Sequence, residues 1–490
     1  MLQTAISSMP GVPLSSPGMD TPETSLLDRF AAIVGARYAI RDAGGIAPYL
    51  AERREKFAGA TPLVLRPGSV AEIAAILKLA NDTRTGVVPQ AGNTGLVGGQ
   101  IPSPAGDQIV VSLSRLNRVR HVDAASNVMI AEAGLILADA HRAAADADRL
   151  FPLSLASEGS CEIGGNLSTN AGGTAVLAYG NARELVLGLE VVLASGEVWN
   201  GLRTLRKDNT GYDLKDLFVG AEGTLGIITA AALKLFPRPR GVAVALLGLK
   251  DPSAALAVFN VAKGLAGFGL TAAELMPRIA VETATKYLAG ARDPLAAPHA
   301  WYLMLEVSSP RNQEDADASI EAIFAESMER GLVEDGVAAK SGAEAAELWR
   351  MREALSDLQK NLGGSIKHDV AVPLAAVPEL LGRAADAAKK LVPGCRPFPF
   401  GHIGDGNIHL NISQPEGMDK QAFLARWDEM NAVVHAIVID LGGTISAEHG
   451  IGTLKRAMLE RVKSPVEMSL MRKIKSALDP HGIMNPGKVL

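Results

Sequence analysis

Two histidines near the C-terminus, His402 and His409, stand on either side of a glycine-rich turn at residues 404–406. Apolar residues before and after the turn predict two strands, and a hairpin would bring the two imidazoles close together. Asn411 shares a face with His409 because side chains alternate along a strand. Such a pair suits a metal ion, although a single histidine here would equally well cap a strand or satisfy a hydrogen bond in the core.

A carboxylate and a third histidine, Glu448 and His449, follow in a second segment of small residues, 446–452. Two imidazoles and one carboxylate suit Zn²⁺ or Mn²⁺ and leave coordination positions open to a substrate. Such a metal would acidify a hydroxyl group bound to it, and a neighbouring neutral histidine would then take the proton. The chain has only nine histidines, so three in two such segments favour chemistry over packing.

Four glycine-rich stretches in the first half of the chain offer a place for a cofactor. They are residues 89–99, 160–166, 170–174 and 220–226. The first follows a predicted strand, and the exposed N–H groups of such a turn form an anion nest suited to a pyrophosphate. It matches neither the P-loop nor the dinucleotide fingerprint. A surface turn would explain one such stretch, but four together favour an extended ligand.

The elements around these segments predict a mixture of strands and helices. Residues 61–90 read as a strand, a helix capped by Ser69 and a second strand that runs into the first glycine stretch. A final helix is expected after Ser464, with Pro465 at its first position. Further β-rich stretches lie at 108–113, 127–133, 188–199 and 227–236, and helices are expected at 252–267 and 314–331. The run 237–240, Pro-Arg-Pro-Arg, marks a domain boundary.

The whole-chain properties exclude several classes of protein. A length of 490 residues predicts two or three domains. A net charge of −5 gives no reason to expect nucleic-acid binding. Two cysteines, Cys161 and Cys395, make no disulfide framework, so we expect a reduced compartment, the cytoplasm. No apolar run reaches the roughly 20 residues of a spanning helix.

Two adjoining motifs connect these features to a known family. The run Arg206–Lys215, RKDNTGYDLK, followed by Phe218–Ile228, FVGAEGTLGII, resembles the FAD-binding domain of the vanillyl-alcohol oxidase/p-cresol methylhydroxylase superfamily. Within it, the chain is similar to the branch of D-lactate and D-2-hydroxyglutarate dehydrogenases, from about residue 40 to Asn485-Pro-Gly-Lys488.

The resemblance implies an α+β fold in which an FAD-binding domain precedes a substrate-binding cap domain with an antiparallel sheet. We therefore expect a flexible leader at 1–25, the FAD-binding domain at 26–237 and the cap domain at 238–455. A short helical segment, 456–490, would return to the flavin.

The resemblance also implies which residues hold the cofactor. They are Pro89, Gly92, Asn93, Thr94, Gly95, Gly98, Gly99, Ser160, Gly164, Gly165, Asn170, Gly173, Ile228 and Asn485. Some relatives attach FAD covalently through a histidine or cysteine beside the first loop. Residues 85–105 contain neither residue, so a non-covalent FAD is expected.

The same resemblance implies that His402, His409 and Glu448 bind the metal, with Zn²⁺ as the first choice and Mn²⁺ or Co²⁺ as alternatives. His449 would be the base and Asn411 would lie near the substrate carboxylate.

A distal carboxylate of the substrate would meet Arg352, Ser356 and Lys367. Arg352 and Ser356 share a helix face, but from position alone the arginine and the lysine read equally as solvated surface charges. The family carries threonine where Ser356 stands, and an aromatic residue where His368 follows Lys367. These differences leave the length of the substrate open.

The expected activity is oxidation of a D-2-hydroxy acid, with D-2-hydroxyglutarate first and D-malate second. D-Lactate or glycolate oxidation is the alternative within the family. A zinc hydrolase, or a flavoprotein without catalytic activity, represents a different class. We expect a soluble acceptor such as electron-transferring flavoprotein, and a homodimer, with no membrane span.

Overall fold

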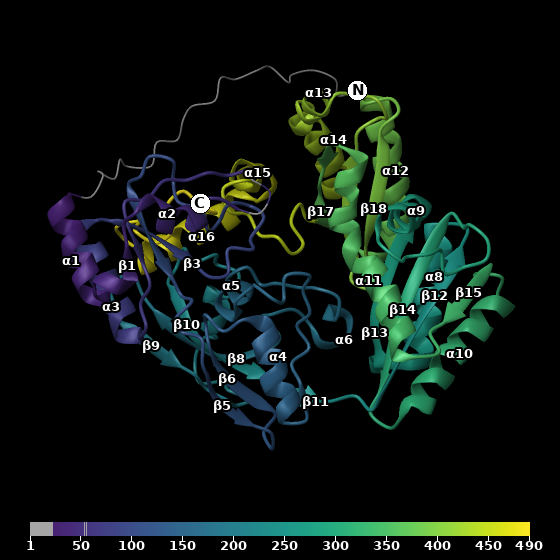
Figure 1. Ribbon diagram of the computed structural model, residues 1–490, viewed down its shortest axis with the longest axis horizontal. Helices are drawn as coiled ribbons and strands as arrows, with labels where there is room; N and C mark the ends of the chain where they lie inside the picture. The colour runs from purple at the N-terminus through teal and green to yellow at the C-terminus, as the bar shows by residue number, and fades with distance from the viewer. Residues whose placement is uncertain (1–22, 53, 55) are drawn as a thin grey trace.

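Figure 1 shows the protein as a computed structural model, which describes residues 23–52, 54 and 56–490. The N-terminal half and the yellow C-terminal segment form one body, and the teal and green middle of the chain forms a second body beside it. The leader expected at 1–25 lies outside the described residues as far as residue 22. The expected end of the leader, residue 25, lies inside helix α1 (Thr24–Val34).

The first domain contains two larger sheets around one apolar core. The mixed sheet, in the order β1-β2-β4-β3, is formed by β1 (Ala39–Ile40), β2 (Val64–Leu65), β3 (Gly86–Gln90) and β4 (Gln108–Ser112). The antiparallel sheet, in the order β5-β6-β10-β8-β9, is formed by β5 (Val119–Asp123), β6 (Val128–Glu132), β8 (Val186–Val192), β9 (Val198–Gly201) and β10 (Ile227–Lys234). A short pair joins β7 (Arg149–Leu150) to β11 (Phe236–Pro237). The helices that follow α1 are α2 (Ala43–Ile46), α3 (Val70–Thr83), α4 (Leu137–Asp146), α5 (Ile163–Ser168), α6 (Val176–Tyr179) and α7 (Lys215–Phe218).

The strand–helix–strand unit predicted at 61–90 is confirmed. The Ser69 hydroxyl accepts the N–H of Glu72 at 3.2 Å, and the Glu72 carboxylate accepts the N–H of Gly68 at 2.8 Å, so both side chains hold the start of α3. Strands β2 and β3 each run parallel to β4, which lies between them. The β-rich stretch expected at 188–199 is confirmed as β8 and β9, which a turn at Gly196, with φ of 84°, separates.

The second domain is built on an eight-stranded antiparallel sheet. Its strands are β12 (Gly241–Leu249), β13 (Leu270–Pro277), β14 (Trp301–Ser309), β15 (Asp335–Ala338), β16 (Ser365–Ile366), β17 (Asp369–Ala371), β18 (Arg396–His402) and β19 (Asn407–Ser413). They follow the order β15-β12-β14-β13-β18-β19-β16, and β17 also pairs with β19.

Helices cover both faces of this sheet. One face packs against α8 (Pro252–Ala266), α10 (Gln313–Glu329), α12 (Val377–Leu391) and α14 (Trp427–Asp440). The other face packs against α9 (Arg278–Tyr287) and α11 (Gly342–Leu358). A short helix, α13 (Lys420–Leu424), precedes α14. Because both faces are covered, the strands are apolar at successive positions rather than only at alternate ones.

The hairpin expected around residues 404–406 is confirmed as β18 and β19. Phe400 pairs with His409, and His402 pairs with Asn407. Since side chains alternate along a strand, His402 and His409 point to the same face of the sheet as α11. The hairpin therefore brings together residues that lie apart in the sequence.

The C-terminal segment contains α15 (Arg456–Val462) and α16 (Pro465–Leu478) and then returns to the first domain. Ser464 and Glu467 form the predicted capping box of α16. Met484 forms a bridge with Val87 of β3, and the N–H of Asn485 donates to the Val87 carbonyl at 2.8 Å. None of the helices described is both long enough and apolar enough to cross a bilayer.

Candidate functional site

His402, at the end of β18, is held by a carboxylate from the neighbouring strand. Its Nδ1 lies 2.6 Å from Oε1 of Glu274 on β13. Glu274 is fully buried, and its Oε2 accepts from Nε and Nη2 of Arg352 at 2.7 and 2.6 Å. Burial alone would lower the pKa of His402, but the Glu274 carboxylate raises it to about 9. This leaves Nε2 directed toward the Glu448 carboxylate, 3.9 Å away.

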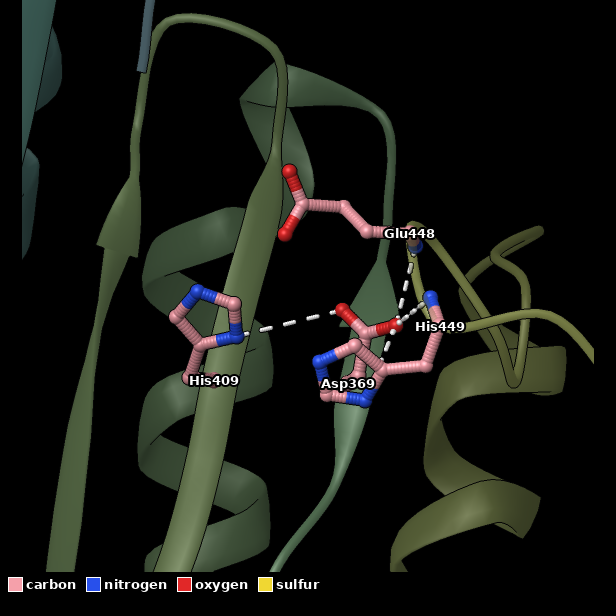
Figure 2. Close-up of side chains that lie close together, drawn as sticks. All are labelled: Asp369, His409, Glu448 and His449. Carbon is pink, nitrogen blue, oxygen red and sulfur yellow. Dashed lines mark hydrogen bonds and ion pairs between the residues drawn. The ribbon is translucent and has the colours of Figure 1, made fainter. Parts of the chain in front are cut away.

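Figure 2 shows a second group of side chains, which includes Glu448. Asp369, His409, Glu448 and His449 each offer one ligand atom within 4.8 Å of the others. Asp369 is at the centre, with Oδ1 3.8 Å from Nδ1 of His409 and Oδ2 3.6 Å from Nδ1 of His449. The rings of His409 and His449 are nearly parallel, with centroids 6.2 Å apart. Strand β19, the short strand β17 and the loop after α14 therefore meet at one point.

These side chains fit a divalent metal ion. The predicted ligands His409 and Glu448 belong to the four-residue group, and His402 adjoins it, with its ring 5.5 Å from that of His409. Histidines that bind metals usually donate their second ring nitrogen to a carboxylate, as His402 does to Glu274. The mixture of imidazole and carboxylate donors suits Zn²⁺ or Mn²⁺.

The His449 imidazole is in its neutral form near neutral pH, the form in which a histidine can accept a proton. Burial lowers its pKa to about 4, although the Asp369 carboxylate acts in the opposite direction, so the imidazole is neutral near neutral pH. Asp369 also accepts the backbone N–H groups of Glu448 and His449, both at 2.9 Å. Despite its burial, the pKa of Asp369 lies below its usual range because these donors and neighbouring positive charges favour the carboxylate.

Of the residues predicted to bind a distal carboxylate, Ser356 and Lys367 lie together. The Lys367 ammonium donates to the Ser356 carbonyl at 3.1 Å and lies 3.5 Å from its hydroxyl. Arg352 lies one turn earlier on α11, is buried, and has two of its nitrogens engaged by Glu274. Asn411 donates to Gln359 at 3.0 Å. Arg352 therefore supports the His402 side of the site in this structure.

The surroundings of Lys367 are rich in positive charge. Burial, followed by the nearby Arg54 guanidinium, lowers the pKa of Lys367 to about 7. The Asp357 carboxylate raises this pKa, and Lys360 and Lys56 lower it. The ammonium of Lys56 lies 3.5 Å from the centre of the Trp427 ring, so a segment of the first domain reaches the second domain here. Such a place favours an anion.

The predicted cofactor loops converge in the first domain. A Cβ on Gly92 would lie 2.0 Å from the Ser160 carbonyl, and one on Gly223 would lie 2.5 Å from the Pro89 ring. The Asn485 amide donates to the carbonyl of Gly99 at 2.9 Å. Close backbone approach of this kind requires glycine. The first loop thus touches the second and fourth glycine-rich stretches and the C-terminal segment.

The remaining predicted cofactor residues lie on the same loops or next to them. Gly173 donates its N–H to Glu448 at 2.5 Å. This bond connects the third glycine-rich stretch to the metal-binding group, that is, to the predicted ligands His402, His409 and Glu448. Ile228 is buried in β10 rather than on a loop. Thr94, Gly95 and Gly98 belong to the first loop, Gly164 and Gly165 to α5, and Asn170 follows α5.

Several buried polar atoms in these loops fit a bound flavin nucleotide. Among the described residues, Oδ1 of Asn93, Nδ2 of Asn166 and Oδ1 of Asn485 are buried without a hydrogen-bond partner. Oε2 of Glu162 is in the same state, and burial raises the pKa of this carboxyl group to about 8. Both donors and acceptors are present, as a ligand with ribose hydroxyls and ring carbonyls and N–H groups requires.

Sequence reasoning missed three carboxylates that organise the site. Glu274 is the one charged residue of strand β13, and this isolation within an apolar run was a usable signal. Asp369 was noticed only as the end of the Lys367 motif. Glu222 lies in the fourth glycine-rich stretch, where its Oε1 and Oε2 accept the N–H groups of Ile451 and Gly452 at 2.7 and 2.8 Å.

Comparison with known proteins identifies matches over both domains. Residues 61–201 match a family model described as an FAD binding domain, and residues 238–489 match the C-terminal domain of FAD linked oxidases. The D-2-hydroxyglutarate–pyruvate transhydrogenase of Saccharomyces cerevisiae is 38% identical over 446 residues, which cover 89% of this chain and 88% of that protein. The D-2-hydroxyglutarate dehydrogenase of Xanthomonas citri pv. viticola is 38% identical over 423 residues, covering 86% and 88%.

Solved structures share the fold at lower sequence identity. p-Cresol methylhydroxylase superposes with a TM-score of 0.75 at 16% identity and covers 95% of this chain and 96% of its own. Alkyldihydroxyacetonephosphate synthase superposes with a TM-score of 0.74 at 17% identity, covering 99% and 88%. The two-domain architecture with an antiparallel cap sheet is therefore that of the p-cresol methylhydroxylase type.

Proposed function

This chain belongs to the FAD-linked oxidases, and from that premise we propose D-2-hydroxyglutarate as its substrate, Zn²⁺ as its metal and His449 as its catalytic base. The chain is an FAD-linked D-2-hydroxy-acid dehydrogenase, and relatives of similar length are named for D-2-hydroxyglutarate. D-Malate is the second candidate substrate. Mn²⁺ and Co²⁺ are the alternative metals.

One observation carries the proposal. The N–H of Gly173, in a predicted cofactor loop, donates to the carboxylate of Glu448, in the predicted metal-binding group. A flavin in the glycine-rich loops and a metal between the histidines would therefore flank one space, where a 2-hydroxy acid can meet both. A site for hydrolysis would need the metal but not the loops.

The residues of the chain divide the chemistry between them. His402, His409 and Glu448 would hold the metal, which supplies a positive charge that orients the acid and favours loss of its hydroxyl proton. FAD bound in the glycine-rich loops would supply the acceptor for the hydride of the α-carbon. His449, neutral because it is buried, takes the hydroxyl proton. Loss of one hydride and one proton converts the hydroxy acid to the 2-oxo acid.

The distal end of the acid is assigned to Lys367 and Ser356. A second carboxylate would place a negative charge beside Lys367, whose pKa is lowered first by burial and then by the Arg54 guanidinium. The names of the relatives, which act on D-2-hydroxyglutarate, point to the same substrate. D-Lactate and glycolate, the alternatives, have no second carboxylate to offer.

Flavin reduction by a panel of acids tests the proposal. The purified protein should be yellow, and the flavin band should bleach fastest with D-2-hydroxyglutarate, more slowly with D-malate and slowest with D-lactate. His449→Ala should retain FAD and lose roughly 10²- to 10⁴-fold in the rate of bleaching, the usual contribution of a general base. An unbleached flavin with every acid, or a colourless protein that cannot be reconstituted, contradicts the proposal and returns the alternatives of a non-catalytic flavoprotein and a zinc hydrolase.

The proposal also includes the acceptor that takes the electrons from the reduced flavin. A soluble carrier such as electron-transferring flavoprotein fits a chain in which no dinucleotide fingerprint is found. The name of the yeast relative adds pyruvate as a second candidate. Adding pyruvate to the bleached enzyme without oxygen separates the two, because only a transhydrogenase would regain its colour.

Two whole-protein properties remain proposals. A homodimer is proposed, and light scattering of the purified protein would test it. The cytoplasm is proposed from cysteine usage alone, whereas several relatives are named as mitochondrial. Fractionation of the native cells would decide between these locations.

A further inference from the structure

The loop that carries His449, residues 448–452, is held by two buried carboxylates from opposite sides. On one side stands Asp369, at the start of β17 in the second domain. Its Oδ2 accepts the backbone N–H groups of Glu448 and His449, each at 2.9 Å. Asp369 is 2% exposed, so these bonds form away from water, where a charge-assisted hydrogen bond is strong.

On the other side stands Glu222, in the fourth glycine-rich stretch of the first domain. Oε1 accepts the N–H of Ile451 at 2.7 Å, and Oε2 accepts the N–H of Gly452 at 2.8 Å. Glu222 is 8% exposed. Four backbone N–H groups of this five-residue loop therefore donate to carboxylates. Asp369 of the second domain accepts two of them, and Glu222 of the first domain accepts the other two.

Gly450 separates the two N–H groups that donate to Asp369 from the two that donate to Glu222. Its φ is 83°, which reverses the chain between the two pairs of donors. A Cβ at this position would lie 2.8 Å from Oε1 of Glu222, so the backbone passes close against that carboxylate. The Ser446 hydroxyl donates to the Gly450 carbonyl at 2.6 Å and closes the loop on itself.

Glu222 is itself held in an unusual conformation. Its φ of 52° lies in the left-handed region, which glutamate rarely adopts and which is retained only where surrounding contacts impose it. The N–H of Glu222 donates to the Ser168 carbonyl at 2.8 Å, and its carbonyl accepts from the Asn485 amide at 2.8 Å. The cofactor loops thus fix the place from which Glu222 reaches the second domain's loop.

A buried lysine balances the two carboxylates. Lys455 is 7% exposed. Burial lowers its pKa, and the carboxylates of Asp369 and Glu222 act in the opposite direction because they favour the ammonium form. Its ammonium donates to the Ile445 carbonyl at 2.9 Å, just before the loop. The positive charge lies on the same stretch of chain as the loop, which makes the arrangement tolerable in a buried place.

We infer that Glu222 is a positioning residue that, together with Asp369, sets the place of His449 between the cofactor loops and the metal-binding group. The inference rests on the proposed role of His449 as base. Glu222 touches no reacting atom; it acts by tying the loop to the domain that binds the flavin. A shift of about 1 Å in a catalytic group is enough to cost on the order of 10²-fold in rate.

The test replaces Glu222 and follows flavin reduction per bound flavin. Glu222→Gln has the same size but offers one oxygen, so its NH₂ group faces one of the two N–H donors. Glu222→Asp keeps both oxygens, and aspartate tolerates the left-handed backbone. Glu190→Gln is the matched control, since Glu190 is a buried carboxylate of the same domain that binds Arg120 and Thr229, away from the loop.

With the acid that bleaches the wild-type flavin fastest, Glu222→Gln should lower the saturated rate by about 10- to 100-fold and change KM by less than about 3-fold. Glu222→Asp should lie between it and the wild type, and Glu190→Gln should match the wild type. A wild-type rate per flavin in Glu222→Gln would overturn the inference, as would an equal loss in Glu190→Gln or no recovery in Glu222→Asp. Counting only bound flavin keeps the test valid if the variant binds less FAD.

His449→Ala, measured in parallel, separates this inference from the proposed function. If His449→Ala keeps full activity, the proposed function fails, whatever Glu222 does. If His449→Ala is inactive and Glu222→Gln is unaffected, the base stands and only the inference about Glu222 fails.

Discussion

Burial sets the protonation of the side chains that do the chemistry. It is the largest influence on both His449, whose pKa falls to about 4, and Lys367, whose pKa falls to about 7. The first shift supplies a neutral base. The second means that only part of the Lys367 side chains carry a proton near neutral pH. An anion that binds there favours the protonated, positively charged form.

The binding of a dicarboxylate should therefore depend on pH through Lys367. Since the pKa of Lys367 is lowered to about 7, its ammonium form is present below that pH and is lost above it, and KM for D-2-hydroxyglutarate should rise as the pH rises through about 7. Lys367→Ala should raise that KM by about 10- to 100-fold, from the loss of a charge-assisted hydrogen bond, and flatten its pH dependence. Steady-state kinetics with D-2-hydroxyglutarate and D-lactate measure both effects.

Lys360→Ala is the control variant for this experiment. Lys360→Ala removes an exposed lysine of the same neighbourhood that pairs with Asp357, and should change KM little. Equal losses for D-lactate and D-2-hydroxyglutarate in Lys367→Ala would show that Lys367 does not bind a distal carboxylate.

At the scale of elements, the β18–β19 hairpin gathers the metal-binding group. It presents His402 and His409 on one face, while β13 supplies Glu274 behind His402 and β17 supplies Asp369 beside His409. Glu274 and Asp369 both come from strands paired with the hairpin. The sheet register thus decides the ring orientations as well as the positions.

Metal affinity should consequently increase with pH. The pKa of His402 is raised to about 9 by Glu274, so without the metal the imidazole carries a proton below that pH, and the metal must displace it. Zn²⁺ titration of chelator-treated protein should show tighter binding up to about pH 9, and Zn²⁺, Mn²⁺ or Co²⁺ should restore activity. His402→Ala should lose the metal, as measured by elemental analysis.

His435→Ala serves as the control for that variant. His435 is a largely buried histidine that contacts His368 and lies outside the metal-binding group. It should keep the full metal content. Stoichiometric Zn²⁺ in His402→Ala would remove His402 from the ligand set.

At the scale of the molecule, the site lies where two domains and the returning C-terminal segment meet. Glu222 of the first domain binds the loop after His449, and Asn485 of the C-terminal segment binds Gly99 and Glu222. The chain passes from the first domain to the second and back again (Figure 1). The cofactor loops are therefore completed by the last residues of the chain.

Asn485→Ala should weaken FAD binding. The variant loses two amide donors to buried carbonyls, at 2.9 and 2.8 Å, and puts a less tolerant residue at a φ of 44°. One lost hydrogen bond of this kind corresponds to about 10-fold in affinity. Fluorescence titration of the apoprotein with FAD measures the change.

Asn127→Ala is the matched control, because Asn127 also has a positive φ, of 54°, but lies in the first domain beside Arg149. It should lower thermal stability without changing FAD affinity. If both variants bound FAD as the wild type does, Asn485 would have no part in holding the cofactor.

Local patterns were enough to predict many of the elements. Ser69 and Ser464 each cap a helix as expected, and the turn at 404–406 forms the expected hairpin. Such signals act between residues a few positions apart, so neighbouring sequence contains all of the information. The two strands within the β-rich stretch 188–199 were not told apart, although Ser195, Gly196 and Glu197 interrupt its apolar run.

The supporting carboxylates were beyond the reach of such patterns. Glu274 and His402 are bound to each other across 128 positions, and Glu222 and Ile451 across 229. A buried charge in a sequence shows that it needs a partner, but only the fold decides which one. Arg352 illustrates the difference, since it was expected at the substrate and is found paired with Glu274.

The sequence by itself determined the residue types and their local setting: the glycine-rich loops, the hairpin with its histidines and the family to which the motifs belong. The tertiary structure alone decided the geometry that turns these parts into one site, namely the strand register behind His402 and the two carboxylates that hold the loop of His449. The physical reason is that burial, and with it the pKa of each group, arises only when distant segments pack together and exclude water.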